Sequence, residues 1–235
     1  HVYYSLDQYG EPTIPRVAIR MDSDSIAEVR GIAPNQNTDP YIGDVIAAKM
    51  TEFPDGEEYQ EKSADMARVT EIEERLKQEG QELSSVDLRF LYEVDGKIEG
   101  FGYQRDPRID ALLIDRDPRV DLANALNCRP EQISFTKEDA LSGTVDKPIL
   151  YHHGNLVLYR RSSLEFILPQ RVGGNFSLSG ITSAEGLTMP QSVGGTIDLR
   201  DLTSAKGLTL PQRVGGGIYL SGLTSAEGLI LPASV

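Results

Sequence analysis

The sequence predicts an α+β region followed by a parallel β-solenoid, and three observations support this fold class. A motif recurs every 21 residues in the last third of the chain, with a Val-Gly-Gly triplet beginning at Val172, Val193 and Val214. Each copy contains one short segment of alternating apolar residues, which is typical of a strand. The residues before the copies show strand-like and then helical patterns. A fixed period of this length indicates a repeat architecture.

Residues 1–35 carry the alternation of a small antiparallel β-meander. Turn-forming residues at 9–12 and 22–24 separate three strand-like segments. The apolar positions of the second segment fall on one face: Val17, Ile19 and Met21. The opposite face is expected to carry charged residues: Arg16, Arg20, Glu28 and Arg30. Such a patch either binds a carboxylate or phosphate of a partner or consists of cross-strand charge pairs, and we favour the pairs.

Residues 39–135 show a mainly helical pattern. Three Asp-Pro pairs match a helix N-cap followed by proline at the first helical position: Asp39-Pro40, Asp106-Pro107 and Asp117-Pro118. A long helix is predicted over about residues 57–79, with apolar residues at helical spacing: Met66, Val69, Ile72 and Leu76. Residues 84–87 resemble a capping box and predict a short helix with four core candidates: Leu88, Phe90, Leu91 and Tyr92.

Negative charge is concentrated in the first part of the chain. Residues 1–150 hold 31 acidic and 17 basic residues, whereas residues 151–235 hold 5 and 6. Nucleic-acid binding depends on Lys and Arg that neutralise phosphates, so this acidic region argues against a nucleic-acid partner. We interpret the acid excess as a solvent-exposed surface.

The residue types needed for metal or redox chemistry are scarce. Cys128 is the only cysteine, which excludes an intrachain disulfide and disfavours a cysteine-based zinc site. His152 and His153 are adjacent, and adjacent residues of a strand point to opposite faces, so we do not expect them to share a metal ion. We predict neither a metal nor a cofactor.

Catalytic motifs are equally hard to find in the sequence. It contains no nucleophile elbow, phosphate-binding glycine loop or histidine-glutamate zinc motif. The acids at Glu71, Glu73 and Glu74 lie in a dense charge run that is typical of a solvated helix face. We therefore assign no catalytic residue. An enzyme or nucleic-acid-associated module in residues 1–150, with the repeats as a targeting domain, is the alternative to a binding protein.

The repeats comprise about three and a half copies over residues 154–235. Their stacking explains how such short strands become stable. One strand per 21 residues cannot bury its own apolar face, but stacked coils can, because each strand pairs in parallel with the previous one. The inward positions are Phe176, Leu178, Ile197, Leu199, Ile218 and Leu220, with a second column at Leu187, Leu208 and Leu229. Val-Gly-Gly is expected to form a conformationally permissive corner before each strand.

Pairs of Thr and Ser also recur in every copy: Thr182-Ser183, Thr203-Ser204 and Thr224-Ser225. A column of hydroxyls can order water or a regular ligand. We favour the interpretation that these hydroxyls bond backbone groups at a corner of each coil.

The spacing of Leu199, Leu202, Leu208 and Leu210, with their counterparts in the other copies, resembles a leucine-rich repeat. The sequence departs from that family at the position of its buried asparagine ladder, where this chain has Asp201 or Gly, so a general β-solenoid is the alternative. The first region, with the segments at 15–21 and 29–37, is similar to uncharacterised proteins of uncultured bacteria that carry such repeats. That similarity implies no activity.

Leucine-rich repeats usually bind proteins through their strand-bearing face, so the resemblance implies a binding surface at the outward strand positions. These are Val157, Tyr159, Ser177, Ser179, Asp198, Arg200, Tyr219 and Ser221. The outward positions vary between copies while the inward ones do not, and Tyr and Arg contribute strongly to interfaces. We predict a non-enzymatic protein–protein interaction scaffold. Drift at exposed positions is the other explanation of the variation.

Three further expectations concern the environment of the chain. It has no apolar run of 18 residues, so we expect no membrane insertion. No leader pattern follows His1, and we expect a soluble, cytoplasmic protein. The chain begins at His1 without a methionine, and the repeat pattern stops at Val235 where Gly-Gly is due, so both ends look cut. An uncapped last coil would expose a strand edge and is expected to cause self-association.

Overall fold

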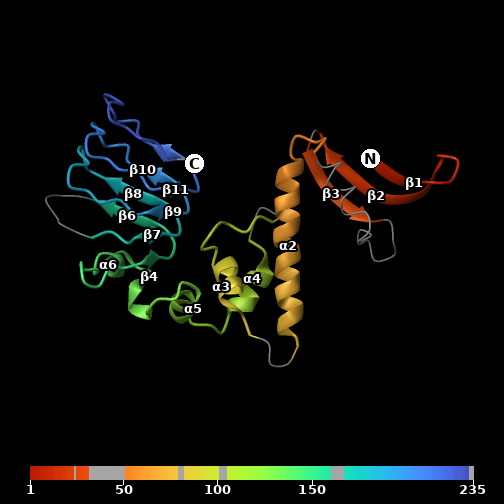
Figure 1. Cartoon of the computed structure of the whole chain (residues 1–235), viewed down its shortest axis with the longest axis horizontal. Coiled ribbons are helices and arrows are strands. Elements are labelled where there is room, and N and C mark those ends of the chain that lie inside the picture. Colours follow the sequence, from red (N-terminus) through yellow and green to blue (C-terminus); the bar gives the residue numbers. More distant parts are fainter. Residues whose placement is uncertain (24, 32–50, 79–81, 101–104, 160–166, 233–235) are drawn as a thin grey trace. The chain divides into compact units, whose positions relative to one another are not determined.

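The computed structural model describes the chain except for residues 24, 32–50, 79–81, 101–104, 160–166 and 233–235. The chain divides into two compact units (Figure 1). The first comprises His1–Glu74 with Glu99–Arg108, and the second comprises Arg75–Ile98 with Ile109–Val235. Each unit is described by itself.

The first unit contains the predicted antiparallel meander. Its strands are β1 (Val2–Leu6), β2 (Pro12–Asp22) and β3 (Ser25–Gly31), in the order β1-β2-β3. Ile19 is buried, and the apolar side chains that pack around it are Tyr3, Met21, Ile26, Val29, Phe53 and Tyr59. The meander is thus confirmed, with one apolar face that forms a small core.

The long helix α2 (Gly56–Leu76) lies near the residue range predicted for it. Two backbone N–H groups of β3 tie the strand to the start of this helix. That of Ile26 donates to Asp55 Oδ2 over 2.6 Å, and that of Val29 donates to the Tyr59 hydroxyl over 2.9 Å. Of the four expected core residues, Val69 and Ile72 are buried, and Met66 and Leu76 are half-buried.

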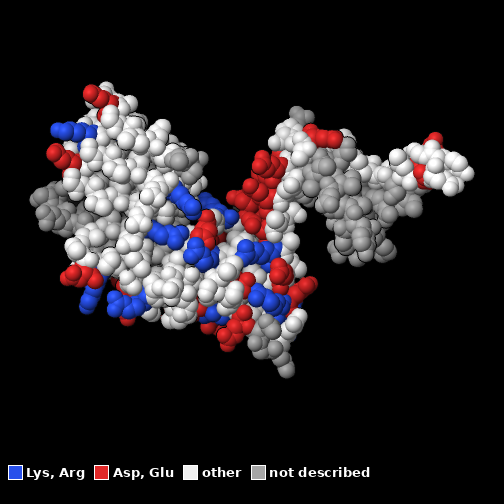
Figure 2. Space-filling model, in the orientation of Figure 1, with Lys and Arg blue, Asp and Glu red and all other residues white. Residues whose placement is uncertain are grey.

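Acidic side chains lie along much of the visible side of α2 (Figure 2). Glu71 and Glu74 are exposed, as expected for a solvated helix face. Glu73 is half-buried and lies 3.9 Å from the Arg108 guanidinium. The charge run is therefore explained by solvation and ion pairing on the helix surface.

The shorter helices begin at the residues that their capping patterns indicate. They are α3 (Ser85–Leu91), α4 (Pro107–Leu113), α5 (Pro118–Ala125) and α6 (Lys137–Ala140). Asp117 accepts hydrogen bonds from the backbone N–H groups of Arg119 and Val120 at the start of α5. Ser84 and Asp87 form the predicted capping box of α3. The third Asp-Pro pair, Asp39-Pro40, lies outside the described residues.

A buried polar cluster joins α3 to α5. The Tyr92 hydroxyl, just after α3, donates to Asp121 Oδ2 over 3.0 Å. The Arg116 guanidinium donates to both oxygens of Asp121 over 2.6 and 2.7 Å. Burial raises the pKa of Tyr92, so the phenol stays protonated and acts as a donor. The cluster fixes the helices that precede the repeats.

Two parallel sheets form a β-solenoid of about four turns in the second unit (Figure 1). The first sheet, in the order β11-β9-β7-β5-β4, contains β4 (Ile133–Ser134), β5 (Tyr151–His152), β7 (Arg171–Val172), β9 (Ser192–Val193) and β11 (Arg213–Val214). The second sheet, in the order β12-β10-β8-β6, contains β6 (Leu156–Tyr159), β8 (Phe176–Ser179), β10 (Ile197–Asp198) and β12 (Ile218–Tyr219). The predicted parallel stacking is confirmed. Each copy contributes two strands, whereas the sequence indicated one.

The sheets begin before the first recognisable repeat. β4 pairs in parallel with β5, so residues 133–134 already belong to the stack. Ala140 of α6 is fully buried in the solenoid core, and Leu141 packs against the same core. α6 thus covers apolar side chains of the first coil, as a terminal cap of a repeat protein does.

Inward side chains form one continuous core in the solenoid. Phe176, Leu178, Ile197 and Leu199 are fully buried, whereas Ile218 and Leu220 of the last coil are half-buried. In the second column, Leu208 is buried while Leu187 and Leu229 pack partly buried against the core. Burial of each large apolar side chain contributes about 1.5–3 kcal/mol to the free energy of unfolding.

The Val-Gly-Gly corners need glycine for a reason that the sequence did not indicate. A Cβ on Gly194 would overlap the carbonyl oxygen of Gly173 in the preceding coil, and a Cβ on Gly215 would overlap that of Gly194. Positive φ angles occur elsewhere, for example 79° at Gly207. The triplet therefore forms the expected corner before each strand, but its glycines allow the coils to approach closely and do not adopt a positive φ.

Threonine hydroxyls link successive coils along one corner. Thr203 Oγ1 donates to the carbonyl of Thr182 over 2.9 Å, and Thr224 Oγ1 donates to that of Thr203 over 3.1 Å. The same carbonyls accept the backbone N–H groups of Thr203 and Thr224. These bonds confirm the structural interpretation of the Thr-Ser pairs.

Candidate functional site

Outward residues of the second sheet form rows across its four strands. The pairing register places Val157 beside Ser177, Ser177 beside Asp198, and Asp198 beside Tyr219. Tyr159 pairs with Ser179 in the next row. Arg200 and Ser221 each lie two residues beyond a member of the first row and are exposed. The structure thus places six of the eight predicted residues on these strands and Arg200 and Ser221 in the turns just after β10 and β12.

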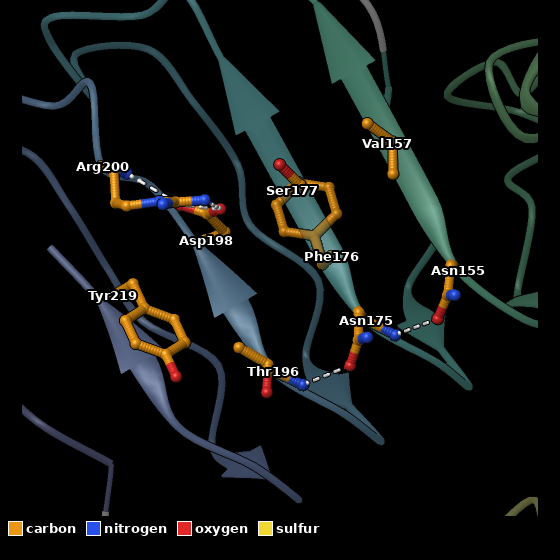
Figure 3. Close-up of a pocket in the computed structure, with 9 residues that line it drawn as sticks. All are labelled: Asn155, Val157, Asn175, Phe176, Ser177, Thr196, Asp198, Arg200 and Tyr219. Carbon is orange, nitrogen blue, oxygen red and sulfur yellow. Dashed lines mark hydrogen bonds and ion pairs between the residues drawn. The ribbon is translucent and has the colours of Figure 1, made fainter.

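The centre of this face is a shallow hollow of about 520 Å³ (Figure 3). Five of the predicted residues line it: Val157, Ser177, Asp198, Arg200 and Tyr219. Tyr159 and Ser179 lie on strands and Ser221 lies in the turn after β12, but none of the three is part of its described lining. Four lining residues were missed by the sequence analysis: Asn155, Asn175, Phe176 and Thr196.

Asn155 and Asn175 form a short ladder at one edge of the hollow. Asn155 Oδ1 accepts the backbone N–H of Asn175 over 2.7 Å, and Asn175 Oδ1 accepts that of Thr196 over 2.8 Å (Figure 3). The Gly-Asn dipeptides at a spacing of 20 residues were the available signal. They marked the repeat, but only the coil stacking shows that the amides bond to the next coil.

Glycine makes room for this ladder. A Cβ on Gly174 would overlap Asn155 Oδ1, and a Cβ on Gly195 would overlap Asn175 Oδ1. The second glycine of the first two triplets therefore faces the asparagine of the preceding coil, and in the third triplet Gly216 faces Thr196. This explains why the two residue types recur together.

Asp198 and Arg200 form an ion pair beside the hollow. Arg200 Nε lies 2.9 Å from Asp198 Oδ1, and Nη2 lies 2.7 Å from Oδ2 (Figure 3). These hydrogen bonds lower the pKa of Asp198. Both side chains are therefore charged at neutral pH, and because their charges are opposite, the pair adds no net charge to the face.

Asp201 occupies the position compared above with the asparagine ladder of leucine-rich repeats. Its Oδ2 accepts the backbone N–H of Gly180 from the preceding coil over 2.7 Å. The carboxylate therefore links two coils, as a ladder amide would. This contact is structural and lies outside the described lining of the hollow.

The charged patch predicted on the meander is only partly described. The register pairs Arg20 with Glu28 and Ala18 with Arg30. Arg20 is exposed, whereas the side chains of Arg16, Glu28 and Arg30 lie outside the described part of the chain. The register is thus the one that charge pairing requires for Arg20 and Glu28, whereas Arg30 lies opposite an alanine. Binding at this patch stays a prediction.

His152 and Ser134 form a buried pair that has no access to solvent. Both residues are at most 1% exposed, and Ser134 Oγ lies 3.0 Å from His152 Nδ1. His152 Nε2 lies 3.2 Å from the carbonyl of Asn155, so it donates to that oxygen. Burial lowers the pKa of His152, which keeps the imidazole neutral. A substrate cannot reach this pair, so its role is structural.

The other reactive residue types give no catalytic arrangement either. Burial raises the pKa of the Cys128 thiol, which disfavours the nucleophilic thiolate. Within the described residues, no group of three His, Cys, Asp or Glu side chains has the geometry to hold a metal ion. None of the described helices is long and apolar enough to cross a lipid bilayer.

Comparison with known proteins gave no relative from which a role could be transferred. No family model, no curated protein and no solved structure matches the chain. The function must therefore be argued from the strand face itself.

Proposed function

We propose that the chain is a non-enzymatic protein–protein interaction scaffold that binds its partner through the outward face of β6, β8, β10 and β12. The observation that carries this proposal is the contrast between the two sides of these strands. Inward positions repeat the same apolar residue types, while the outward rows differ from coil to coil.

Exposed side chains on this face are of the types that stabilise interfaces. Val157, Tyr159 and Tyr219 are 42%, 69% and 56% exposed. Burial of their apolar atoms against a partner would be favourable. Tyr and Arg are enriched among residues that dominate binding energies, and Arg200 lies in the same area. The repeat core supports this face as a rigid platform, so little entropy is lost when a partner binds.

The resemblance to leucine-rich repeats supports the same proposal. Such repeats usually bind proteins through their strands, and here the strands carry the exposed side chains. We propose that this chain is leucine-rich-repeat-like in function as well as in pattern. Its single cysteine fits a reducing compartment, and we propose the cytoplasm.

Partner capture with matched variants tests the proposal. The first variant combines Val157→Ala, Arg200→Ala and Tyr219→Ala on the strand face. The control combines Val120→Ala, Arg213→Ala and Tyr9→Ala, which removes the same side-chain types from exposed positions elsewhere. Proteins captured by the wild-type chain and identified by mass spectrometry are expected to be lost only with the first variant.

Purified candidates are then tested for direct binding to the three proteins. A partner that binds the strand-face variant and the control equally well contradicts the proposal. A partner that is lost with the control but retained by the strand-face variant would place the binding surface elsewhere.

A further inference from the structure

The described lining of the hollow carries no net charge. Its only ionisable acid and base, Asp198 and Arg200, form an ion pair with two parallel hydrogen bonds. The chain as a whole has a net charge of −13, so this neutral area is a local feature. A charged ligand would have to compete with the pair, whereas an uncharged ligand would not.

Several polar groups in the hollow are free to bind a ligand. Asn155 and Asn175 use their Oδ1 atoms for the next coil, and within the described residues their Nδ2 groups make no hydrogen bond. The hydroxyls of Ser177 and Thr196 also make no side-chain hydrogen bond there. Neighbouring strands are about 4.8 Å apart, so the two amides and the Thr196 hydroxyl form a row across the strands. This spacing is similar to the length of one pyranose unit.

Accessible apolar surface in the hollow lies only at its two outer strands, β6 and β12. Val157 lies on β6 and Tyr219 on β12, while the side chain of Phe176 is fully buried. Inside the hollow, apolar contact is therefore available at Val157 and Tyr219, with polar groups between them. A sugar ring has hydroxyls on its edge and an apolar C–H face, and the latter packs well on an exposed tyrosine ring.

We propose that the hollow binds an uncharged saccharide chain that lies across β6, β8, β10 and β12. The Asn155 and Asn175 amides would donate to sugar oxygens, Ser177 and Thr196 would exchange hydrogen bonds with hydroxyls, and Tyr219 would pack against a ring. This inference rests on the proposed function, because it uses the same strand face. It specifies the partner as one that presents a neutral glycan to the hollow.

Calorimetric titration of the full chain with defined oligosaccharides tests this inference. The probes are the neutral hexasaccharides of β-1,4-glucose, β-1,3-glucose, β-1,4-xylose and β-1,4-N-acetylglucosamine, with hexagalacturonate as the charged comparison. At least one neutral probe is expected to bind at millimolar or lower concentration. Its affinity is expected to be the same at low and high salt, because no net charge is involved.

Two variants test the geometry of the site. Asn175→Asp keeps the oxygen that accepts the Thr196 N–H but removes the amide donor, and Tyr219→Ala removes the ring. Each is expected to weaken binding about three- to tenfold. Tyr9→Ala is the control, because Tyr9 is 81% exposed and belongs to the other unit of the chain, outside the strand face. Thermal unfolding of each variant verifies that the fold is retained.

Three outcomes would overturn the inference: no neutral probe binds, the two variants bind as wild type does, or only hexagalacturonate binds and salt abolishes its binding. Partner capture separates this failure from a failure of the proposed function. If the oligosaccharides fail but the triple strand-face variant still loses its protein partners, the face is a protein-binding surface without a saccharide site. If capture also fails to distinguish the variants, the proposed function falls as well.

Discussion

At the scale of single residues, several polar side chains of the solenoid form hydrogen bonds between neighbouring coils. Asn155, Asn175 and Asp201 accept backbone N–H groups of an adjacent coil, and Thr203 and Thr224 donate to backbone carbonyls. The Asn and Asp oxygens satisfy backbone N–H groups that the short strands leave unpaired, whereas the Thr hydroxyls add a second hydrogen bond to carbonyls that already accept a backbone N–H. The outward strand residues predicted to bind a partner do not take part in these hydrogen bonds between coils.

Buried His152 makes the stability of the solenoid sensitive to pH. Burial lowers its pKa in the folded chain below the ordinary value of 6.5, against weaker opposing effects of the hydrogen bond to the Asn155 carbonyl and of the Asp139 charge. The unfolded chain therefore binds a proton more readily than the folded one. The free energy of unfolding is expected to be greatest above about pH 6.5 and to fall as the pH decreases through that value towards the pKa of the folded state.

Urea unfolding at a series of pH values measures this dependence. His152→Asn keeps an acceptor for the Ser134 hydroxyl but cannot be protonated, so its stability is expected to change less between pH 7 and pH 5. His1→Asn is the control, because His1 is exposed. A slope in His152→Asn equal to that of the wild type would contradict the assignment.

At the scale of elements, the corners decide how closely the coils stack. In the second and third Val-Gly-Gly triplets, the first glycine lies against a carbonyl oxygen of the previous triplet, with no space for a Cβ. The parallel strands on either side are only two to four residues long. Such short strands depend on an undisturbed corner for their register.

Gly194→Ala is expected to lower the free energy of unfolding by about 1–3 kcal/mol, because the new methyl group overlaps the carbonyl oxygen of Gly173. Gly217→Ala is the matched control, since a Cβ there meets no atom within 4 Å. Urea unfolding monitored by circular dichroism measures both. Equal stability of the two variants would show that the coils do not stack as closely as described.

Elements that depend on local chemistry were predictable, and those that depend on stacking were not. The starts of α3 and α5 follow from Ser84 and Asp117, because a cap acts on the next three residues. The second strand of each coil was missed because it is two residues long beside a glycine pair. The hollow was missed because it depends on side-chain size across strands, which only the register determines.

At the scale of the whole molecule, the last described coil differs from those inside the stack. Ile230 and Leu231 are 79% and 63% exposed, and Ile218 and Leu220 are only half-buried. β12 has one sheet neighbour, β10, in the described part of the chain. Apolar surface beside an unpaired strand edge favours association with another strand.

We therefore expect this chain to self-associate at high concentration, with a second copy covering the last coil. Ile230→Glu combined with Leu231→Glu is expected to shift the equilibrium towards the monomer, because burial of two carboxylates is unfavourable. Val145→Glu, at a position 84% exposed elsewhere, is the control. Sedimentation velocity measures all three, and a wild-type chain that stays monomeric at high concentration would contradict the prediction.

The account depends most on parallel stacking of the 21-residue coils, since only this arrangement aligns the outward residues into one face. Nuclear Overhauser effects between backbone protons of neighbouring strands in solution test it directly. The structure predicts contacts between residues separated by 21 positions from β8 onwards, such as Ser177 with Asp198 and Asp198 with Tyr219, and by 20 positions between β6 and β8. Contacts between residues whose numbers have a constant sum, as in antiparallel hairpins, would contradict the stacking and the binding face built on it.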